Sequence, residues 1–194
     1  MIGIRLPVSA DEIRKLKAGD EVAITGVMIT ARDAAHKYLV ETDGEDVKEL
    51  LRDSMIYHCG PVVKKEGDTY SFVAAGPTTS IREEPYEATV IEKYGVRGVI
   101  GKGGMGAKTL GACGEFGSVY LSAVGGLATT LARSVVEVLD VHKLEEFGVP
   151  EAMWVIRVED FPAVVTMDSH GNSIHEDIAE LSRKNYERLV GKTS

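Results

Sequence analysis

Five residues of this 194-residue chain have the chemistry to bind an anion, and each is expected at the end of a strand or the start of a helix. They are Arg32, Thr78, Thr79, Arg82 and Lys102. Free backbone N–H groups and the helix dipole favour a negative charge at such positions. A cation is unusual there, because Asp or Glu is the common charged residue of a first helical turn. A carboxylate or phosphate ligand would explain the three cations.

The same residues also have ordinary structural explanations. The hydroxyls of residues 78–80 could cap the helix expected after them. Arg32 and Arg82 could be solvated residues of a first turn. Lys102 could lie in a glycine-rich loop because loops are polar. No single segment decides between anion binding and these explanations.

The glycine-rich segment also resembles a nucleotide-binding motif. Gly101, Gly103 and Gly106 match the pattern G-x-G-x-x-G. A dinucleotide site also needs an acidic residue about 20 positions later, at the end of the next strand. Residues 125–127, which follow the strand expected at 119–124, contain no carboxylate, and the chain has no complete Walker-A pattern G-x-x-x-x-G-K-S/T. Nucleotide binding is therefore disfavoured.

Histidines and cysteines predict no metal site. No two of the five histidines have the HExxH spacing of zinc enzymes. Cys59 and Cys113 are more typical of small buried side chains than of catalytic thiols. Two cysteines form no disulfide framework, which favours a reducing compartment. They are also too few to hold a four-iron cluster.

The composition is that of an ordinary soluble globular protein. The chain has 44 % hydrophobic residues and a net charge of −8, from 22 Lys+Arg against 30 Asp+Glu. This acidic balance disfavours general nucleic-acid binding. No apolar run approaches the roughly 18 residues of a membrane-spanning helix. The first residues do not resemble a signal peptide, so a cytoplasmic location is expected.

Hydrophobic periodicity predicts strands that alternate with helices. Strands are expected at 22–29, 55–58, 70–75, 96–100, 119–124, 153–158 and 163–167, the last two separated by a turn at 160–162. Helices are expected from 10 to before Gly19, from 34 with a break at 43–44, from 80 to 94, and from 173 onwards. The apolar segments 62–63 and 135–141 could face a partner, but core burial is expected.

Three of the helix starts fit a capping box, in which Ser is followed three residues later by Glu. The serines are Ser9, Ser80 and Ser173. The last helix carries Ile178, Leu181 and Leu189 on one face. The alternation predicts one α/β domain over residues 1–194, with a mixed sheet because some strands follow each other without a helix.

Three short segments occur in the order and spacing of a known family. They are 30–36 (TARDAAH), 76–82 (GPTTSIR) and 101–106 (GKGGMG). With them, the chain resembles the class I (iron–sulfur) fumarate hydratases from about residue 6 to 178. The match is to the C-terminal domain, which in many members is a separate β subunit. The same family includes the β subunit of L(+)-tartrate dehydratase.

The resemblance implies a swivelling β/β/α layered domain with a mixed sheet. It implies a hydro-lyase that adds water reversibly to fumarate to give L-malate. It also implies a [4Fe–4S] cluster, which three cysteines of a partner α subunit hold and which this chain does not bind. The chain would then be inactive alone and would act in an oligomer with that α subunit.

Residue by residue, the resemblance implies that Arg32, Arg82 and Lys102 bind the substrate carboxylates. Thr78 would donate a hydrogen bond, and Thr79 would be the general base. These types suit the chemistry, because removing a proton next to a carboxylate builds negative charge that fixed cations stabilise. Arg suits bidentate carboxylate binding, and Lys acts as a point charge.

Two other functions remain open. One is the β subunit of an L(+)-tartrate dehydratase, whose substrate carries one more hydroxyl and needs the same cations. The other is a non-catalytic anion-binding or assembly module of the same fold.

Overall fold

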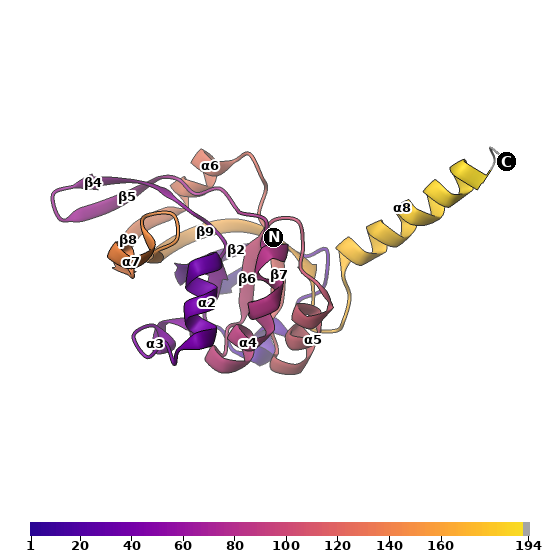
Figure 1. Cartoon of the computed structure of the whole chain (residues 1–194), viewed down its shortest axis with the longest axis horizontal. Coiled ribbons are helices and arrows are strands. Elements are labelled where there is room, and N and C mark those ends of the chain that lie inside the picture. Colours follow the sequence, from indigo (N-terminus) through magenta and orange to yellow (C-terminus); the bar gives the residue numbers. More distant parts are fainter. Residues whose placement is uncertain (192–194) are drawn as a thin grey trace.

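A seven-stranded mixed sheet forms the centre of the computed structural model, which describes residues 1–191 (Figure 1). Its order is β1-β2-β3-β6-β7-β9-β8. The strands are β1 (Ile2–Arg5), β2 (Glu21–Thr30), β3 (Met55–Tyr57), β6 (Gly98–Gly101), β7 (Val119–Ser122), β8 (Val135–His142) and β9 (Met153–Met167). The first five strands in this order run parallel, whereas β9 is antiparallel to β2, β7 and β8. The expected mixed sheet is confirmed.

The sheet closes on itself, because β9 pairs with both β2 and β7. The strands β2, β3, β6, β7 and β9 therefore form a barrel-like ring. Large side chains fill its interior, among them Met28, Tyr57, Leu121, Trp154 and Phe161. The swivelling layered arrangement stays a prediction.

The turn expected at 160–162 is wrong, because β9 is one continuous strand. Asp160 has φ +46°, and Phe161 is fully buried opposite Ile24. Pro162 still pairs with Ala23, and the register shift next to it places one extra residue in β9 between Val158 and Phe161. The polar residue and the proline are typical of a turn, but here they bend a strand.

Four helices cover the outer face of the ring. They are α2 (Asp33–Glu41), α3 (Lys48–Leu51), α4 (Glu84–Tyr94) and α5 (Ala107–Phe116). Figure 1 shows α2, α4 and α5 side by side on that face. Apolar residues such as Leu39, Val90 and Ala112 pack there against Ile56 and Val99 of the sheet. The helix breaks at 43–44 and resumes, as the sequence predicts.

Two of the three capping boxes are confirmed. The hydroxyl of Ser9 accepts from Glu12 N at the start of α1 (Ala10–Ile13). Ser173 does the same for Glu176 N at the start of α8 (Ile174–Val190). The third is wrong, because Ser80 begins a 3₁₀ turn, η1 (Ser80–Glu83), and caps nothing.

Several elements extend from the barrel. The strands β4 (Val62–Glu66) and β5 (Thr69–Ala74) form a separate hairpin, of which the sequence predicted only the second strand. The sequence also predicted neither α6 (Ala128–Arg133) nor α7 (Leu144–Phe147). Val62 is 58 % exposed and Val136 of β8 is 48 % exposed. The other valines of these segments, Val63, Val135, Val138 and Val141, are partly buried against the barrel core. The expected burial is therefore confirmed only in part.

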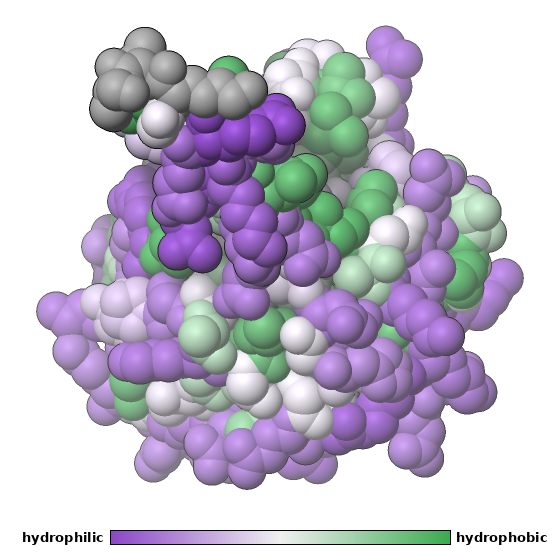
Figure 2. Space-filling view, turned by 90° about the vertical axis from the view of Figure 1, so that its right-hand side faces the viewer, coloured by the Kyte–Doolittle hydropathy of each residue, from purple (hydrophilic) through white to green (hydrophobic). Residues whose placement is uncertain are grey.

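Helix α8 projects from the body of the molecule (Figure 1). It has no buried residue, and Ile178, Leu181 and Leu189 are each at least 60 % exposed. Figure 2, which faces this end, shows a mostly hydrophilic surface with hydrophobic residues next to the helix. Within the part of the chain described, no helix is long and apolar enough to cross a membrane.

Candidate active site

Three neighbouring parallel strands, β2, β3 and β6, end at the same edge of the sheet. Backbone pairing continues past their ends, because Ala31 N donates to Tyr57 O over 3.0 Å and His58 N donates to Ile100 O over 2.8 Å. The segments that follow these strands therefore leave the sheet side by side. Ligand sites of α/β sheets commonly occupy this edge.

The segment 78–80 lies between the ends of β3 and β6, although it follows the separate hairpin. Thr78 N donates to His58 O over 2.7 Å, and Lys102 N donates to Thr78 O over 3.2 Å. Ser80 N then donates to Lys102 O over 3.0 Å, and Thr79 pairs with Lys102 as a parallel bridge. The predicted segments 76–82 and 101–106 are thereby held next to each other.

Arg32 is the residue that precedes α2, and its side chain makes no capping hydrogen bond there. Its Nε lies 3.3 Å from Glu151 Oε1 in an ion pair. A Cβ on Gly60 would stand only 2.6 Å from Arg32 Nη1, so the guanidinium needs a glycine there. The Arg32 side chain is 20 % exposed, which leaves part of it open to a ligand.

Arg82 reaches the start of the same helix through an ion pair. Its Nη2 donates to Asp33 Oδ2 over 2.5 Å. Because Asp33 directly follows Arg32, this contact brings η1 to the end of β2. The Arg82 side chain is 53 % exposed.

Lys102 and Thr79 are exposed, and neither side chain has a hydrogen-bond or ion-pair partner in residues 1–191. Thr78 differs, because its hydroxyl donates to His58 O over 3.1 Å. The donor role that the resemblance implies for Thr78 therefore requires its hydroxyl to turn.

The helix N-termini at this edge are already capped by carboxylates of the chain. Glu84 accepts from Gly106 N over 2.7 Å and from Lys108 N over 3.0 Å, at the start of α5. Glu151 accepts from Ala34 N over 3.0 Å, at the start of α2. Several N–H groups of these two helix starts are therefore occupied by carboxylates from distant positions, which the sequence analysis did not foresee. The side chains of the cations remain as anion binders.

A buried polar cluster that the sequence analysis missed lies behind these loops. Each member is 0 or 1 % exposed: His36, His58, Ser80, Glu83, Glu87 and Tyr120. The available signal was Glu87, which shares a helix face with the buried Val90, Ile91 and Tyr94. A carboxylate in an apolar helical stripe indicates a buried partner.

Opposite charges decide the protonation of this cluster. Burial by itself lowers the pKa of His36, but Glu87 and Glu83 outweigh burial and raise it to about 9. Burial would raise the pKa of Glu87, yet His36 and His58 bring it well below its usual range. Burial lowers the pKa of His58 and raises that of Glu83 to about 7. The cluster therefore holds a His36–Glu87 ion pair beside a neutral His58.

Three side chains of this cluster, His36, His58 and Glu87, have ligand atoms within 4.8 Å of one another. This is a candidate arrangement for a metal ion. Both Nε2 atoms lie 3.0 Å from the same carboxylate oxygen, Glu87 Oε2. An ion pair and a hydrogen bond account for these contacts. The absence of a metal site stays a prediction.

The two cysteines lie in different cores. Cys59 belongs to the barrel interior and Cys113 to the helical layer. Both thiols are free and buried, and burial raises the pKa of each to about 12. Residues 1–191 therefore offer no cysteine site for an iron–sulfur cluster.

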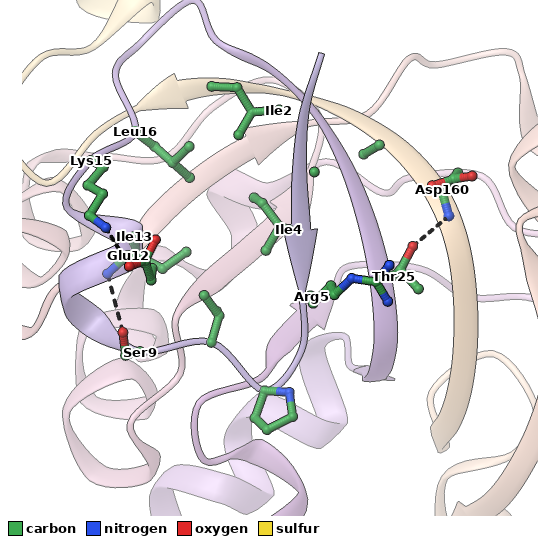
Figure 3. A pocket seen from close by; sticks show the side chains of 14 residues that line it. Ile2, Ile4, Arg5, Ser9, Glu12, Ile13, Lys15, Leu16, Thr25 and Asp160 are labelled. Carbon is green, nitrogen blue, oxygen red and sulfur yellow. Dashed lines mark hydrogen bonds and ion pairs between the residues drawn. The ribbon is translucent and has the colours of Figure 1, made fainter.

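A cavity of about 530 Å³ lies elsewhere, beside β1 and α1 (Figure 3). Ile2, Ile4 and Leu16 contribute apolar side chains to it, and Glu12 pairs there with Lys15. None of the five predicted site residues lines this cavity. It is therefore separate from the edge of the sheet where the loops meet.

Comparison with known proteins identifies relatives over nearly the whole chain. The family model described as "Fumarase C-terminus" matches residues 1–178. A putative fumarate hydratase class I from Geobacillus stearothermophilus is 53 % identical over 94 % of this chain. The match spans only 35 % of that protein, about a third of its length.

Two further relatives are named as separate subunits. A putative L(+)-tartrate dehydratase subunit beta from Methanocaldococcus jannaschii is 44 % identical over 92 % of this chain and 91 % of its own length. The L(+)-tartrate dehydratase subunit beta of Escherichia coli is 39 % identical over 95 % of this chain and 91 % of its own.

Proposed function

Because the chain belongs to the fumarase C-terminus family, we propose that it is the β subunit of a hydro-lyase that interconverts fumarate and L-malate. The observation that carries this proposal is the meeting of the three loops at one edge of the sheet. Arg32, Arg82 and Lys102 belong to those loops. Separate cations suit a substrate with a carboxylate at each end.

In the proposed reaction, L-malate loses a proton from the carbon next to one carboxylate and its C–O bond to the hydroxyl breaks. The products are fumarate and water. Arg32, Arg82 and Lys102 bind the carboxylates and stabilise the charge that builds during proton removal. Glu151 and Asp33 pair with the two arginines in the free chain. Each guanidinium has five N–H donors, so it can bind substrate while it shares or releases that partner.

Thr79 is the proposed general base, and Thr78 is the proposed hydrogen-bonding residue beside it. A free hydroxyl is a poor base, so its pKa must be lowered by nearby cations and by exclusion of water. Thr79 is exposed in the chain alone. We therefore propose that a partner subunit covers it.

The residues of this chain do not fit the iron–sulfur cluster of the proposed enzyme, since the two cysteines lie in different cores. We assign the cluster to a partner α subunit.

The test is the conversion of fumarate, followed anaerobically, by the full chain alone and by the chain mixed with its cluster-bearing partner. We expect conversion only in the mixture. Thr79→Ala in the mixture should abolish conversion, and Thr79→Ser should retain part of it. Full activity of Thr79→Ala, together with inactive Arg82→Ala, would remove Thr79 from the mechanism but keep the site.

One observation favours L(+)-tartrate as the substrate instead. The chain spans 91 % of two relatives named as L(+)-tartrate dehydratase β subunits, but only a third of the fumarate hydratase. Conversion of tartrate but not fumarate by the mixture would select this alternative. Failure with both substrates would leave an anion-binding or assembly module.

A further inference from the structure

A chain of buried polar contacts runs from β7 through the 78–80 segment to α4. Tyr120 Oη donates to Ser80 Oγ over 2.9 Å. The same Oγ lies 2.9 Å from His58 Nδ1. His58 Nε2 lies 3.0 Å from Glu87 Oε2.

A second branch runs from the same carboxylate to the start of α2. His36 Nε2 lies 3.0 Å from Glu87 Oε2. The other nitrogen of the same imidazole, His36 Nδ1, lies 2.9 Å from Arg32 O. Glu83 Oε2 is 3.8 Å from this Nδ1 and adds a second carboxylate beside His36. The buried Glu87 carboxylate therefore connects two parts of the candidate site. It reaches the 78–80 segment through His58 and Ser80, and it reaches Arg32 through His36.

The donors and acceptors of these contacts assign most of the protons. A backbone carbonyl only accepts, so His36 Nδ1 must carry a hydrogen. The ionised Glu87 also only accepts, so His58 Nε2 carries one. His36 Nε2 lies 3.0 Å from the same carboxylate as an ion pair. Burial alone lowers the pKa of His36, but the charges of Glu87 and Glu83 outweigh burial and raise it to about 9, so His36 is an imidazolium. His58 has its hydrogen on Nε2, and its Nδ1 accepts from Ser80, which accepts from Tyr120.

We propose that Glu87, His36 and His58 are positioning residues that hold Arg32 and the 78–80 segment in one fixed relation. That this arrangement serves catalysis rests on the proposed function. The three side chains are fully buried and touch no substrate. They act through the carbonyl of Arg32 and through Ser80.

The backbone around His58 shows why a small movement of this chain would reach the site. Its carbonyl accepts both the amide and the hydroxyl of Thr78, and its amide donates to Ile100 at the end of β6. A Cβ on Gly101 would stand 1.8 Å from Ser80 Oγ and 3.3 Å from His58 Nδ1. The cluster is therefore packed directly against the strand that leads to Lys102.

The first test is nitrogen NMR of the histidine rings in the full chain, labelled with ¹⁵N-histidine, at pH 7.5. We expect a ring with hydrogens on both nitrogens that is lost in His36→Gln, and, among the neutral rings, an Nε2–H ring that is lost in His58→Gln. Glu87→Gln should convert His36 to a neutral ring. Glu92→Gln, an exposed carboxylate of the same helix, should change neither. This experiment requires no enzymatic activity.

The second test separates positioning from a merely structural role. In the mixture with the partner, Glu87→Gln should raise KM for the converted substrate about tenfold or more, with a smaller change in kcat. Glu92→Gln should leave both unchanged.

A neutral His36 in the unsubstituted chain would overturn the proposal, as would a metal ion bound by the two rings. An unchanged KM in a folded Glu87→Gln chain would overturn it too. If the mixture converts no substrate, the proposed function fails, and the ring protonation still decides whether the buried chain of contacts exists.

Discussion

At the scale of single residues, the candidate site combines cations that differ in how firmly they are held. Arg32 is mostly buried against Gly60 and paired with Glu151. Arg82 is half exposed, and its pair with Asp33 lies at the surface. Exposed ion pairs contribute about 0 to 1 kcal/mol to folding. Arg82 is therefore better placed to serve binding than stability.

We expect Arg82→Ala to lower kcat/KM of the two-subunit mixture by roughly 100-fold or more, because one charge-stabilising donor is lost. The free energy of unfolding should change by less than about 1 kcal/mol. Urea unfolding and steady-state kinetics measure the two effects. Arg157→Ala is the matched control, since Arg157 pairs with Glu137 at similar exposure. Equal kinetic losses in both variants would remove the special role of Arg82.

At the scale of elements, the position of the 78–80 segment depends on β3 and β6 rather than on the hairpin that precedes it. Its amides and carbonyls complete the pairing of residues 58 and 102 beyond the strand ends. The segment is thus held as a short extra strand at the edge of the sheet. The close approach of Ser80 to Gly101 is the sterically tightest point of this arrangement.

Gly101→Ala should destabilise the chain by about 1–3 kcal/mol, because the new methyl group overlaps the Ser80 hydroxyl. The measurement is urea unfolding of the full chain. Gly111→Ala should instead stabilise it by about 0.5–1 kcal/mol, since Gly111 lies in α5 and a Cβ there meets nothing within 4 Å. Similar effects of the two substitutions would contradict the tight packing at Gly101.

At the scale of the whole molecule, a closed barrel with helices on one outer face buries two apolar cores and one charged cluster. A buried ion pair depends on the protonation of both partners, so the cluster should be visible in the stability of the entire chain. Helix α8 takes no part in either core. Global stability and the projecting helix are therefore expected to be independent.

The free energy of unfolding should fall as the pH rises from about 6.5 to 9. Burial alone lowers the pKa of His36, but the Glu87 and Glu83 charges raise it to about 9, whereas the unfolded value is 6.5. Between these values only the folded chain holds the proton, so rising pH favours unfolding, by a few kcal/mol in total. Urea unfolding at pH 7 and 9 tests this. His36→Gln should remove most of the pH dependence, whereas His170→Gln, at an exposed histidine, should retain it.

Truncation after Ile178 should leave the melting temperature within about 4 °C of the full chain, because the removed part of α8 has no buried residue up to Val190. His175, which packs against Gly104, is kept in this variant. Thermal unfolding followed by circular dichroism measures the effect. A larger fall in melting temperature would mean that α8 contributes to the folded core.

The sequence by itself determined many of the local elements. Alternation and capping residues predicted the buried strand at 22–29, the helix start at Ser9 and a helix after Ser173, because these depend on near neighbours. That this last helix projects from the body was not predicted. The mixed character of the sheet was also predicted, but from strand pairs that do not form: 70–75 belongs to the separate hairpin, and 153–167 is one strand. The resemblance carried by three short motifs named the family that the comparisons confirm.

Only the tertiary structure decided how these elements meet. Closure of the barrel depends on β9 pairing with β2 and β7, which are far away in the chain. Glu84 and Glu151 cap α5 and α2 from distant positions. Ser80 caps no helix and instead joins Tyr120 and His58. The charge of His36 likewise depends on carboxylates of other elements. Such long-range contacts leave no periodic pattern in the sequence, because they are set by the packing of whole elements rather than by neighbouring residues.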